Sequence, residues 1–394
     1  MASASNLEKQ IKRHVIGRSQ HFYAITAPGL EKICARELVQ LSDTIRLDAV
    51  TSGGVSFSGR LDDLLRGNLH LRTAGRLLMR LETFNATNFR QLRKKASTVS
   101  WNRYLPEGNL PQCSITTHHS RLYHTRAVAE HLTGAIADYW RARGVEIQAQ
   151  TGQTLHVRIE QDTVTLSLDS SGLNLYMRGI KSHGARAPLR ETLAAGILRL
   201  AGYSPERPLI DPMCGAGTFS LEATLMAKRI APGRHRQFAF MQWPAFRPKR
   251  WRHLTTLADR CVRGHPYPLI FASDIDATAC DRLQSTVERF ELADAMQVAC
   301  RDFFTLNPPM KGRDQLPTGL VVLNPPYGRR LTADRSLRQL YSRIGQKLHG
   351  DFKGWRAAVL LPQTDLIRTL PLGSRPIRLM HGGLTLYLLV GKVG

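Results

Sequence analysis

The chain has 394 residues, a length that predicts two or three domains. Hydrophobic residues make up 42% of it, which is enough for buried cores and excludes a wholly disordered chain. The 55 Lys and Arg residues outnumber the 31 Asp and Glu residues, and this gives a formal net charge of +24. Such an excess predicts a polyanionic partner, above all a nucleic acid.

The sequence contains no feature of a membrane or secreted protein. No apolar run approaches the roughly 18–20 residues that span a bilayer, and the first twenty residues contain no apolar signal core. The six cysteines form no Cys-x-x-Cys pair, which indicates a reducing compartment without a disulfide framework or zinc ribbon. The densest histidine group, His118, His119 and His124, has no carboxylate or cysteine at ligand spacing. We expect a cytoplasmic protein without a metal site, and nothing in the sequence points to an obligate protein partner.

The first half of the chain predicts an α+β fold. Residues 1–20 are polar and basic, and we expect a flexible arm. Residues 21–170 mix strand patterns, as at 22–26, with helical patterns, as at 125–143. Gly53-Gly54 separates two short strand patterns and predicts a hairpin. We therefore assign residues 21–170 to one N-terminal region.

Strand and helix patterns alternate regularly over residues 171–394, which we assign to a second domain. This alternation predicts an α/β fold with a parallel sheet and helices on both faces. The last two strand patterns, at 377–380 and 384–390, are joined by three residues only. Such a connection is too short for a crossover, so the sheet must end in an antiparallel hairpin.

The first motif, Asp211-Pro212-Met213-Cys214-Gly215-Ala216-Gly217-Thr218, follows an apolar strand and opens a helix. Glycines in such a turn let a ligand approach the backbone beside the free N–H groups of the helix. The motif is neither a dinucleotide fingerprint nor a phosphate-binding loop. Its initial aspartate suits a ligand with an ammonium group. A plain strand–helix turn is the alternative interpretation.

Two further strand patterns end in carboxylates. Asp274 follows the first of them and is placed to bind both hydroxyl groups of a ribose. Asp276 is expected to cap the next helix. Asp302 follows the second pattern, where it could accept a hydrogen bond from an adenine amino group or be solvated at the surface.

The motif Asn324-Pro325-Pro326-Tyr327-Gly328 ends a third apolar strand pattern. The side-chain oxygen of Asn324 and the carbonyl of Pro325 can accept both N–H bonds of an exocyclic amine, and Tyr327 can stack on the ring that carries it. Catalysis by such a site consists mainly of positioning and electrostatics. A simple Pro-Pro turn is the alternative interpretation.

Three motifs resemble, in this order, those of the class I (Rossmann-like) S-adenosyl-L-methionine-dependent methyltransferases of the UPF0020/RlmL-like family, which act on amino groups of RNA bases. They are residues 211–218, Ser273-Asp274-Ile275-Asp276 and residues 324–328. Arg178-Gly179 and residues 187–195 resemble that family's segment before the glycine turn, and the N-terminal half resembles its ferredoxin-like/THUMP region. The resemblance covers residues 21–394. It implies S-adenosyl-L-methionine as the cofactor and N2 of a guanine in 23S ribosomal RNA, or in a pre-ribosomal particle, as the substrate.

The resemblance also implies roles for single residues. The cofactor would contact the glycine turn and three carboxylates, and the target base would lie in the Pro-Pro turn. The cofactor set is Asp211, Pro212, Gly215, Gly217, Thr218, Asp274 and Asp302; the base set is Asn324, Pro325, Pro326 and Tyr327. Cys214 is expected to be a packing residue. Because the chain ends soon after Gly328, we do not expect the fused second methyltransferase domain that some members carry.

Two basic segments are candidates for RNA contact. Residues 228–253 contain eight Lys or Arg residues and no acidic residue, interleaved with aromatic residues that could stack on bases or pack inward. Arg90, Arg93, Lys94 and Lys95 form a second cluster that could equally be a solvated helix face. Alternative functions are N6-adenine methylation of RNA or DNA, guanine-N2 methylation of tRNA, and a non-catalytic role as a ribosome-assembly factor.

Overall fold

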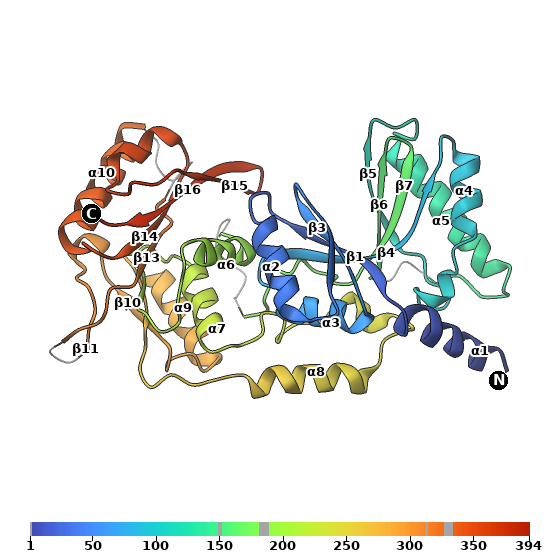
Figure 1. The fold of residues 1–394 in the computed structure, drawn as a ribbon, viewed down its shortest axis with the longest axis horizontal. Coiled ribbons are helices and arrows are strands. Elements are labelled where there is room, and N and C mark those ends of the chain that lie inside the picture. The colour runs from blue at the N-terminus through green and yellow to red at the C-terminus, as the bar shows by residue number, and fades with distance from the viewer. Residues whose placement is uncertain (1, 149–151, 181–188, 312–313, 327–333) are drawn as a thin grey trace. The chain divides into compact units, whose positions relative to one another are not determined.

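The computed structural model describes residues 2–148, 152–180, 189–311, 314–326 and 334–394 (Figure 1). The chain divides into two compact units, each gathered from three separate stretches. The first unit consists of Met1–Thr26, Cys34–Leu175 and His235–Thr256, and the second of Ala27–Ile33, Tyr176–Arg234 and Leu257–Gly394. The predicted domain of residues 171–394 is therefore interrupted, because residues 235–256 belong to the first unit.

The first unit contains a seven-stranded sheet with the order β2-β3-β1-β4-β7-β6-β5 (Figure 1). Neighbouring strands are antiparallel except β5 and β6, which are parallel. Along β1, buried Phe22 and Ala24 alternate with more exposed residues, as a strand with one face on a core requires. The strands are β1 (Gln20–Thr26), β2 (Arg46–Thr51), β3 (Gly54–Gly59), β4 (Ala74–Asn85), β5 (Gln112–His118), β6 (Thr154–Glu160) and β7 (Thr163–Asp169).

The hairpin predicted at Gly53-Gly54 is confirmed, since β2 and β3 pair on either side of it. The sequence did not predict β5, because this strand has no fully buried residue to mark an apolar face. Helices accompany the sheet, and the largest buried side chains of the unit include Trp101 and Trp140. The helices are α2 (Glu31–Leu41, of which Cys34 onward lies in this unit), α3 (Leu61–His70), α4 (Phe89–Ser97) and α5 (Thr125–Arg141).

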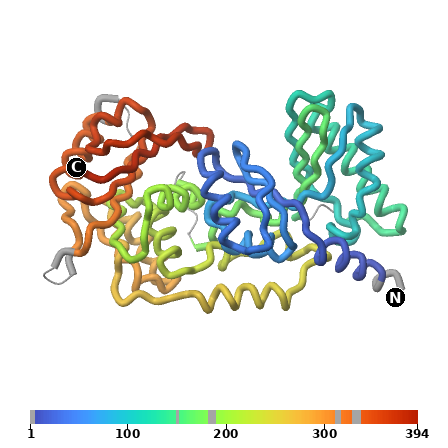
Figure 2. Tube along the Cα trace, viewed as in Figure 1, coloured from blue at the N-terminus to red at the C-terminus, as the bar shows by residue number. Residues whose placement is uncertain are grey.

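The N-terminal segment is helical, so the predicted flexible arm is wrong. Helix α1 (Ala2–Ile11) continues into the helical turn η1 (Lys12–Ile16) (Figure 2). Leu7, Ile11 and Val15 recur every four residues and form an apolar stripe. Ile11 and Val15 are buried in the core of the first unit, with 4% and 1% of their surface exposed. Burial of this stripe holds the segment in place.

The aromatic residues of the basic stretch 228–253 pack inward. Phe238, Phe240 and Trp243 are buried in the core of the first unit, and the indole Nε1 of Trp243 donates to Oε1 of Gln153 at 2.9 Å. Phe246 and Trp251 are partly buried against the same core. Of the two interpretations of these rings, inward packing is confirmed for the three buried ones and stacking on RNA bases is wrong for them, because large apolar rings gain more from burial in a core.

The second unit contains a seven-stranded sheet with the order β10-β9-β8-β13-β14-β16-β15. The first five strands are parallel, and β16 is antiparallel to both β14 and β15, which confirms the predicted terminal hairpin. The main strands are β8 (Leu209–Asp211), β9 (Ile270–Asp274), β10 (Met296–Cys300), β13 (Leu320–Leu323), β14 (Arg356–Leu361), β15 (Ile377–His381) and β16 (Leu384–Lys392). A small separate pair consists of β11 (Met310–Lys311) and β12 (Asp314–Gln315).

Two apolar clusters pack against this sheet, one around Ile197 and Leu388 and the other around Tyr341 and Phe352. Helices supply much of both clusters, as expected for a parallel sheet whose two faces are covered. The helices are α6 (Glu191–Leu200), α7 (Thr218–Ala227), α9 (Ala277–Arg289) and α10 (Asp334–Asp351), and helix α8 (Pro248–Arg260) begins in the first unit. Over the described part of the chain, no helix is both long and apolar enough to cross a bilayer.

Candidate active site

The predicted site residues follow four adjacent parallel strands of the second unit. Strand β8 lies between β9 and β13, with Asp211 opposite Ala272 and Ile210 opposite Val321. From β8 the chain continues to β9 and β10 on one side of this strand and then returns to β13 and β14 on its other side. The carboxyl ends of β8 and β13 therefore form a topological switch point, where open α/β sheets bind their ligands. The sheet order places the carboxyl ends of β10, β9, β8 and β13 in a row along one edge of the sheet. Asp302, Asp274, the glycine turn and Asn324 follow those ends in the same order.

The glycine turn after β8 has a conformation that requires its two glycines. Gly215 and Gly217 have φ values of +49° and +70°, in the left-handed region that disfavours side chains. A Cβ atom on Gly217 would also collide with the side chain of Leu283, whereas one on Gly215 would meet open space. Gly217 therefore permits close packing of the turn, and Gly215 leaves its outer surface open to a ligand.

The carboxylate of Asp211 is directed into the first turn of α7. Its Oδ2 accepts hydrogen bonds from the backbone N–H of Ser220 at 3.2 Å and from its hydroxyl at 2.5 Å. Asp211 is only 1% exposed, and Pro212 and Thr218 are also buried. These contacts fix the start of α7, and so the free N–H groups beside the turn, relative to β8.

Asp274 joins the end of β9 to the glycine turn. Its Oδ2 accepts from the N–H of Gly215 at 2.8 Å, and its Oδ1 accepts from the N–H of Asp276 at 3.0 Å. Asp274 is half-buried, and each carboxylate oxygen has a second lone pair for a ligand hydroxyl. Asp276 caps α9 by accepting from Thr278 and Ala279, as predicted. The two carboxylates therefore have different roles: Asp274 contacts the glycine turn, and Asp276 caps α9.

Asp302 lies at the surface beyond β10. Its Oδ1 accepts from the N–H of Phe304 at 3.0 Å and so begins the short helical turn Phe303–Thr305. The side chain is exposed, which is compatible with both predicted roles, contact with an adenine and simple solvation. The adenine contact stays a prediction.

Asn324 leaves the end of β13 with its side-chain oxygen buried. No hydrogen-bond donor among the described residues reaches Oδ1 of Asn324. A buried acceptor without a donor costs about 1–3 kcal/mol, a cost that a donor on a ligand would remove. Pro325 is buried and Pro326 exposed, while Tyr327 lies outside the described residues. The buried Oδ1 of Asn324, without a donor among the described residues, thus fits the predicted acceptor of an N–H bond.

A second Asn-Pro-Pro sequence, Asn307-Pro308-Pro309, shows what the setting adds to the motif. Asn307 is exposed and follows the helical turn Phe303–Thr305, not a buried strand. Asn324 instead follows the four residues of β13, all of which are buried. The position at the switch point, not the three-residue motif, distinguishes the two asparagines.

Cys214 is a packing residue, as expected. Burial raises the pKa of its thiol, and the neighbouring carboxylates of Asp211 and Asp274 raise it further. A thiol with a raised pKa stays protonated at neutral pH and is a poor nucleophile. In the part of the chain that the structure describes, no group of three or more His, Cys, Asp or Glu side chains is placed to hold a metal ion.

We expect iodoacetamide at pH 8 to modify Cys261 and Cys300, which are exposed, at least about tenfold faster than Cys214 and Cys34, which are buried. Raising the pH to 9 should leave Cys214 slow, because its raised pKa keeps the thiol protonated there too. Mass spectrometry of the labelled peptides measures each rate, and labelling in urea provides the unfolded control. Equal rates for Cys214 and Cys261 in the folded protein would contradict the packing role.

The sequence reasoning missed a buried ion pair beneath the glycine turn. Nε of Arg178 donates to Oε1 of Glu222 at 2.8 Å, and Nη2 donates to Oε2 at 3.4 Å. The two side chains are 2% and 1% exposed. Glu222 lies on α7, one turn after Thr218, and Arg178 precedes α6 in the chain. The pair ties residues 176–180 to the helix that begins at the turn. Arg178-Gly179 was recognised only as part of the family resemblance.

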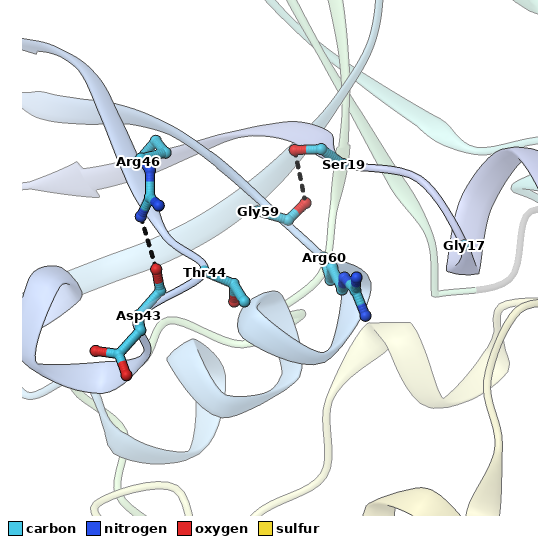
Figure 3. A pocket seen from close by; sticks show the side chains of 7 residues that line it. All are labelled: Gly17, Ser19, Asp43, Thr44, Arg46, Gly59 and Arg60. Atoms are coloured by element: carbon cyan, nitrogen blue, oxygen red, sulfur yellow. Dashed lines mark hydrogen bonds between the residues drawn. The ribbon is translucent and has the colours of Figure 1, made fainter.

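Two surface hollows contain no residue of these turns. One, of about 350 Å³, is in the first unit and is lined by Gly17, Ser19, Asp43, Thr44, Arg46, Gly59 and Arg60 (Figure 3). The other, of about 240 Å³, includes Pro208 and Gly319, which precede β8 and β13 and so lie at the opposite edge of the sheet. Neither contains a predicted site residue, so the candidate site rests on the switch point and its side chains.

This chain is similar to known families and proteins over most of its length. The family described as UPF0020, RMKL-like, methyltransferase domain matches residues 178–380, and the RlmL ferredoxin-like domain matches residues 21–78. A Synechocystis protein described as a candidate RNA methyltransferase is 33% identical over 376 residues, which are 93% of this chain and 95% of that protein. The ribosomal RNA large subunit methyltransferase K/L of Methylococcus capsulatus is 33% identical over 362 residues, which are 88% of this chain and 48% of that protein.

Solved structures share the fold over nearly the whole chain. A Clostridium difficile 630 protein described as a possible methylase has a TM-score of 0.85 and 26% identity, and the match covers 96% of this chain and 99% of that one. SMU.472, a candidate methyltransferase solved with SAH, has a TM-score of 0.83 and 25% identity, with the same coverage. The predicted class I methyltransferase fold and the ferredoxin-like N-terminal region are confirmed. The chain therefore belongs to the UPF0020 family of RMKL-like methyltransferases.

Proposed function

We propose that this methyltransferase transfers a methyl group from S-adenosyl-L-methionine to N2 of a guanine in 23S ribosomal RNA. The observation that carries the proposal is the adjacency, on β8 and β13, of an open glycine turn and an asparagine whose buried Oδ1 has no donor among the described residues. A cofactor bound to the glycine turn after β8 and an amine bound to Asn324 after β13 would then meet at one edge of the sheet. The ribosomal RNA methyltransferase of Methylococcus capsulatus supports the choice of RNA.

The residues of the glycine turn fit S-adenosyl-L-methionine. Gly215 leaves the surface of the turn open, Asp274 has lone pairs for the ribose hydroxyls, and Asp302 is accessible for the adenine. The relative SMU.472 was solved with SAH, the product that this cofactor leaves after methyl transfer. When bound, the cofactor supplies an electrophilic methyl group on its sulfonium.

The chain's own residues hold the base. Oδ1 of Asn324 and the carbonyl of Pro325 accept the two N–H bonds of the guanine amine, which directs the nitrogen lone pair towards the methyl group. Pro325 and Pro326 fix φ at two successive positions, so these acceptors lose little conformational entropy on binding. The amine loses a proton after methylation, when its acidity is highest, and no strong base is needed. A paired base must first be turned out of its helix to reach this position.

The test is to incubate the purified protein and isotopically labelled S-adenosyl-L-methionine with total RNA and DNA from a strain that lacks the gene. Mass spectrometry of the nucleosides should show labelled N2-methylguanosine, confined to 23S ribosomal RNA. Label in tRNA or on N6 of adenine would refute the proposed substrate but leave the methyl transfer intact. Label in no nucleic acid, with intact cofactor binding by calorimetry, would refute a nucleic-acid substrate altogether.

Adenine N6 is the second candidate because of one specific observation. A Listeria monocytogenes structure described as a predicted N6-adenine-specific DNA methylase matches 95% of this chain with a TM-score of 0.82 and 29% identity. The Asn-Pro-Pro turn accepts either exocyclic amine equally well. Guanine is favoured by the ribosomal RNA methyltransferase relative, and the nucleoside assay separates the two products.

A further inference from the structure

The N-terminal helix lies outside the family regions that match this chain, the first of which begins at residue 21. It is nevertheless fixed to the first unit by more than its apolar stripe. Nε and Nη2 of Arg103 donate to Oε1 of Gln10 at 3.3 and 3.1 Å. Nε2 of Gln20 donates to the carbonyl oxygens of His14 and Val15 at 2.7 and 3.2 Å. These contacts give the helix a defined orientation.

The side of the helix away from the core is basic. Lys9, Lys12 and Arg13 are exposed and recur at spacings of three and four residues, and exposed Arg18 follows. No carboxylate among the described residues forms an ion pair with any of them. Like charges one turn apart destabilise a helix by a few tenths of a kcal/mol per pair. No ion pair among the described residues offsets this cost, so the charges are available to an external anion.

Other charges show how strongly positive this region is. Desolvation, followed by the charges of Arg103, Arg18 and Arg13, holds the pKa of His14 below its usual value. The acidic residue of the segment, Glu8, pairs with Arg247 at 3.6 Å, just before α8. Positive charge continues there on Lys249 and Arg252, both of which are exposed.

The hollow of Figure 3 adjoins the end of the same helix. Gly17 and Ser19 line it together with Arg46 and Arg60, and Asp43 is the acidic residue among its lining residues. The guanidinium of Arg46 donates to the carbonyl oxygens of Asp43 and Ile45 at 2.6 and 3.1 Å. An anionic chain that follows the helix therefore meets further cations where the helix ends.

We propose that this N-terminal basic helix, with Lys9, Lys12, Arg13 and Arg18, binds the phosphate backbone of the RNA substrate, an inference that rests on the proposed function. Exposed cations on a fixed element bind phosphates through counterion release and position an RNA without reading its sequence. A membrane surface fits less well, because an interfacial helix needs its apolar face free, and here that face is buried.

The test removes three of the charges in the full chain with Lys9→Gln/Lys12→Gln/Arg13→Gln. Binding to a 23S ribosomal RNA transcript is measured by fluorescence anisotropy over a range of salt concentrations. If all three cations contact phosphates, the slope of log K against log salt should become shallower by about 2–3, and affinity near 0.15 M salt should fall by about 10- to 100-fold. The KM for RNA should rise correspondingly, while kcat at saturating RNA stays near the wild-type value.

Matched controls separate contact from net charge. Lys353→Gln/Arg375→Gln/Arg378→Gln removes the same three charges from exposed positions of the second unit and should change affinity less than about threefold. Lys9→Arg/Lys12→Arg/Arg13→Lys keeps the charges and should keep wild-type binding. If the glutamine triple variant is misfolded by circular dichroism, the single variants Lys12→Gln and Arg13→Gln take its place, each with an expected slope change of about 0.7–0.9.

Equal effects of the helix variant and the second-unit control would overturn the proposal. Unchanged RNA binding together with lost binding to phosphatidylserine vesicles would overturn it in favour of a membrane. The wild-type protein tests the underlying function separately. Failure of the wild type to methylate any RNA refutes the proposed function, whereas normal RNA methylation by the helix variant at wild-type KM and salt slope refutes this inference alone.

Discussion

Replacing Asn324 with alanine should lower kcat by about 10²- to 10³-fold, the usual effect of removing one preorganised hydrogen-bonding group from a reacting centre. In the proposed reaction the buried Oδ1 of Asn324 accepts an N–H bond of the amine and fixes the direction of its lone pair, and alanine provides no such acceptor. Affinity for S-adenosyl-L-methionine should stay within about twofold, because the residues proposed to bind the cofactor follow β8, β9 and β10. Single-turnover methyl transfer to RNA and calorimetric titration of the cofactor measure the two quantities.

Two variants in the same chain serve as controls for Asn324. Asn307→Ala removes the exposed asparagine of the second Asn-Pro-Pro sequence and should leave kcat unchanged. Asn324→Asp keeps an oxygen acceptor of the same length, so it should lose less activity than Asn324→Ala. Full activity of Asn324→Ala with normal cofactor affinity would show that the Pro-Pro turn does not hold the amine.

Local sequence patterns predicted most of the second unit, because each of these patterns depends only on residues that are close together in the sequence. The strand–helix alternation gave the parallel sheet, and the three-residue link at 381–383 required the antiparallel β15–β16 pair. Once the sheet order is known, Asp211, Asp274 and Asn324 must lie at one edge, since carboxyl ends of parallel strands share an edge. The candidate site was therefore largely predictable from the sequence.

The remaining features depend on contacts between residues far apart in the chain. The sequence shows that Phe238, Phe240 and Trp243 lie among cations, but not that Gln153, some 90 residues earlier, accepts the indole N–H of Trp243. Likewise, Ile11 and Val15 form an apolar stripe that is recognisable in residues 1–20, but the core that covers it comes from other segments. Basic composition alone therefore suggested a stacking surface and a loose arm where the structure has a core and a docked helix.

The buried pair of Arg178 and Glu222 is a further long-range contact, and it gives the largest expected effect on stability. Arg178→Met should destabilise the second unit by about 3–5 kcal/mol, because it leaves the carboxylate of Glu222 buried, at 1% exposure, without this cation. Unfolding in urea is monitored by the hydrogen exchange of peptides from α7. This readout measures the change in stability of the unit that contains the pair. Following α7 is necessary because a chain of two units need not unfold in one transition.

The double variant Arg178→Met/Glu222→Met distinguishes the effect of removing one charge of the pair from the effect of removing both. Replacing both charges with apolar groups of similar size also removes the buried carboxylate of Glu222, so the double variant should be more stable than Arg178→Met. The exposed pair of Arg126 and Glu130, with nitrogen and oxygen 3.1 Å apart, is the matched control, and Arg126→Met should change stability by less than about 0.5–1 kcal/mol. If Arg178→Met and Arg126→Met are equally mild, the buried pair does not hold α7 in place. The orientation of the glycine turn must then come from the contacts of Asp211 with Ser220 and of Asp274 with Gly215.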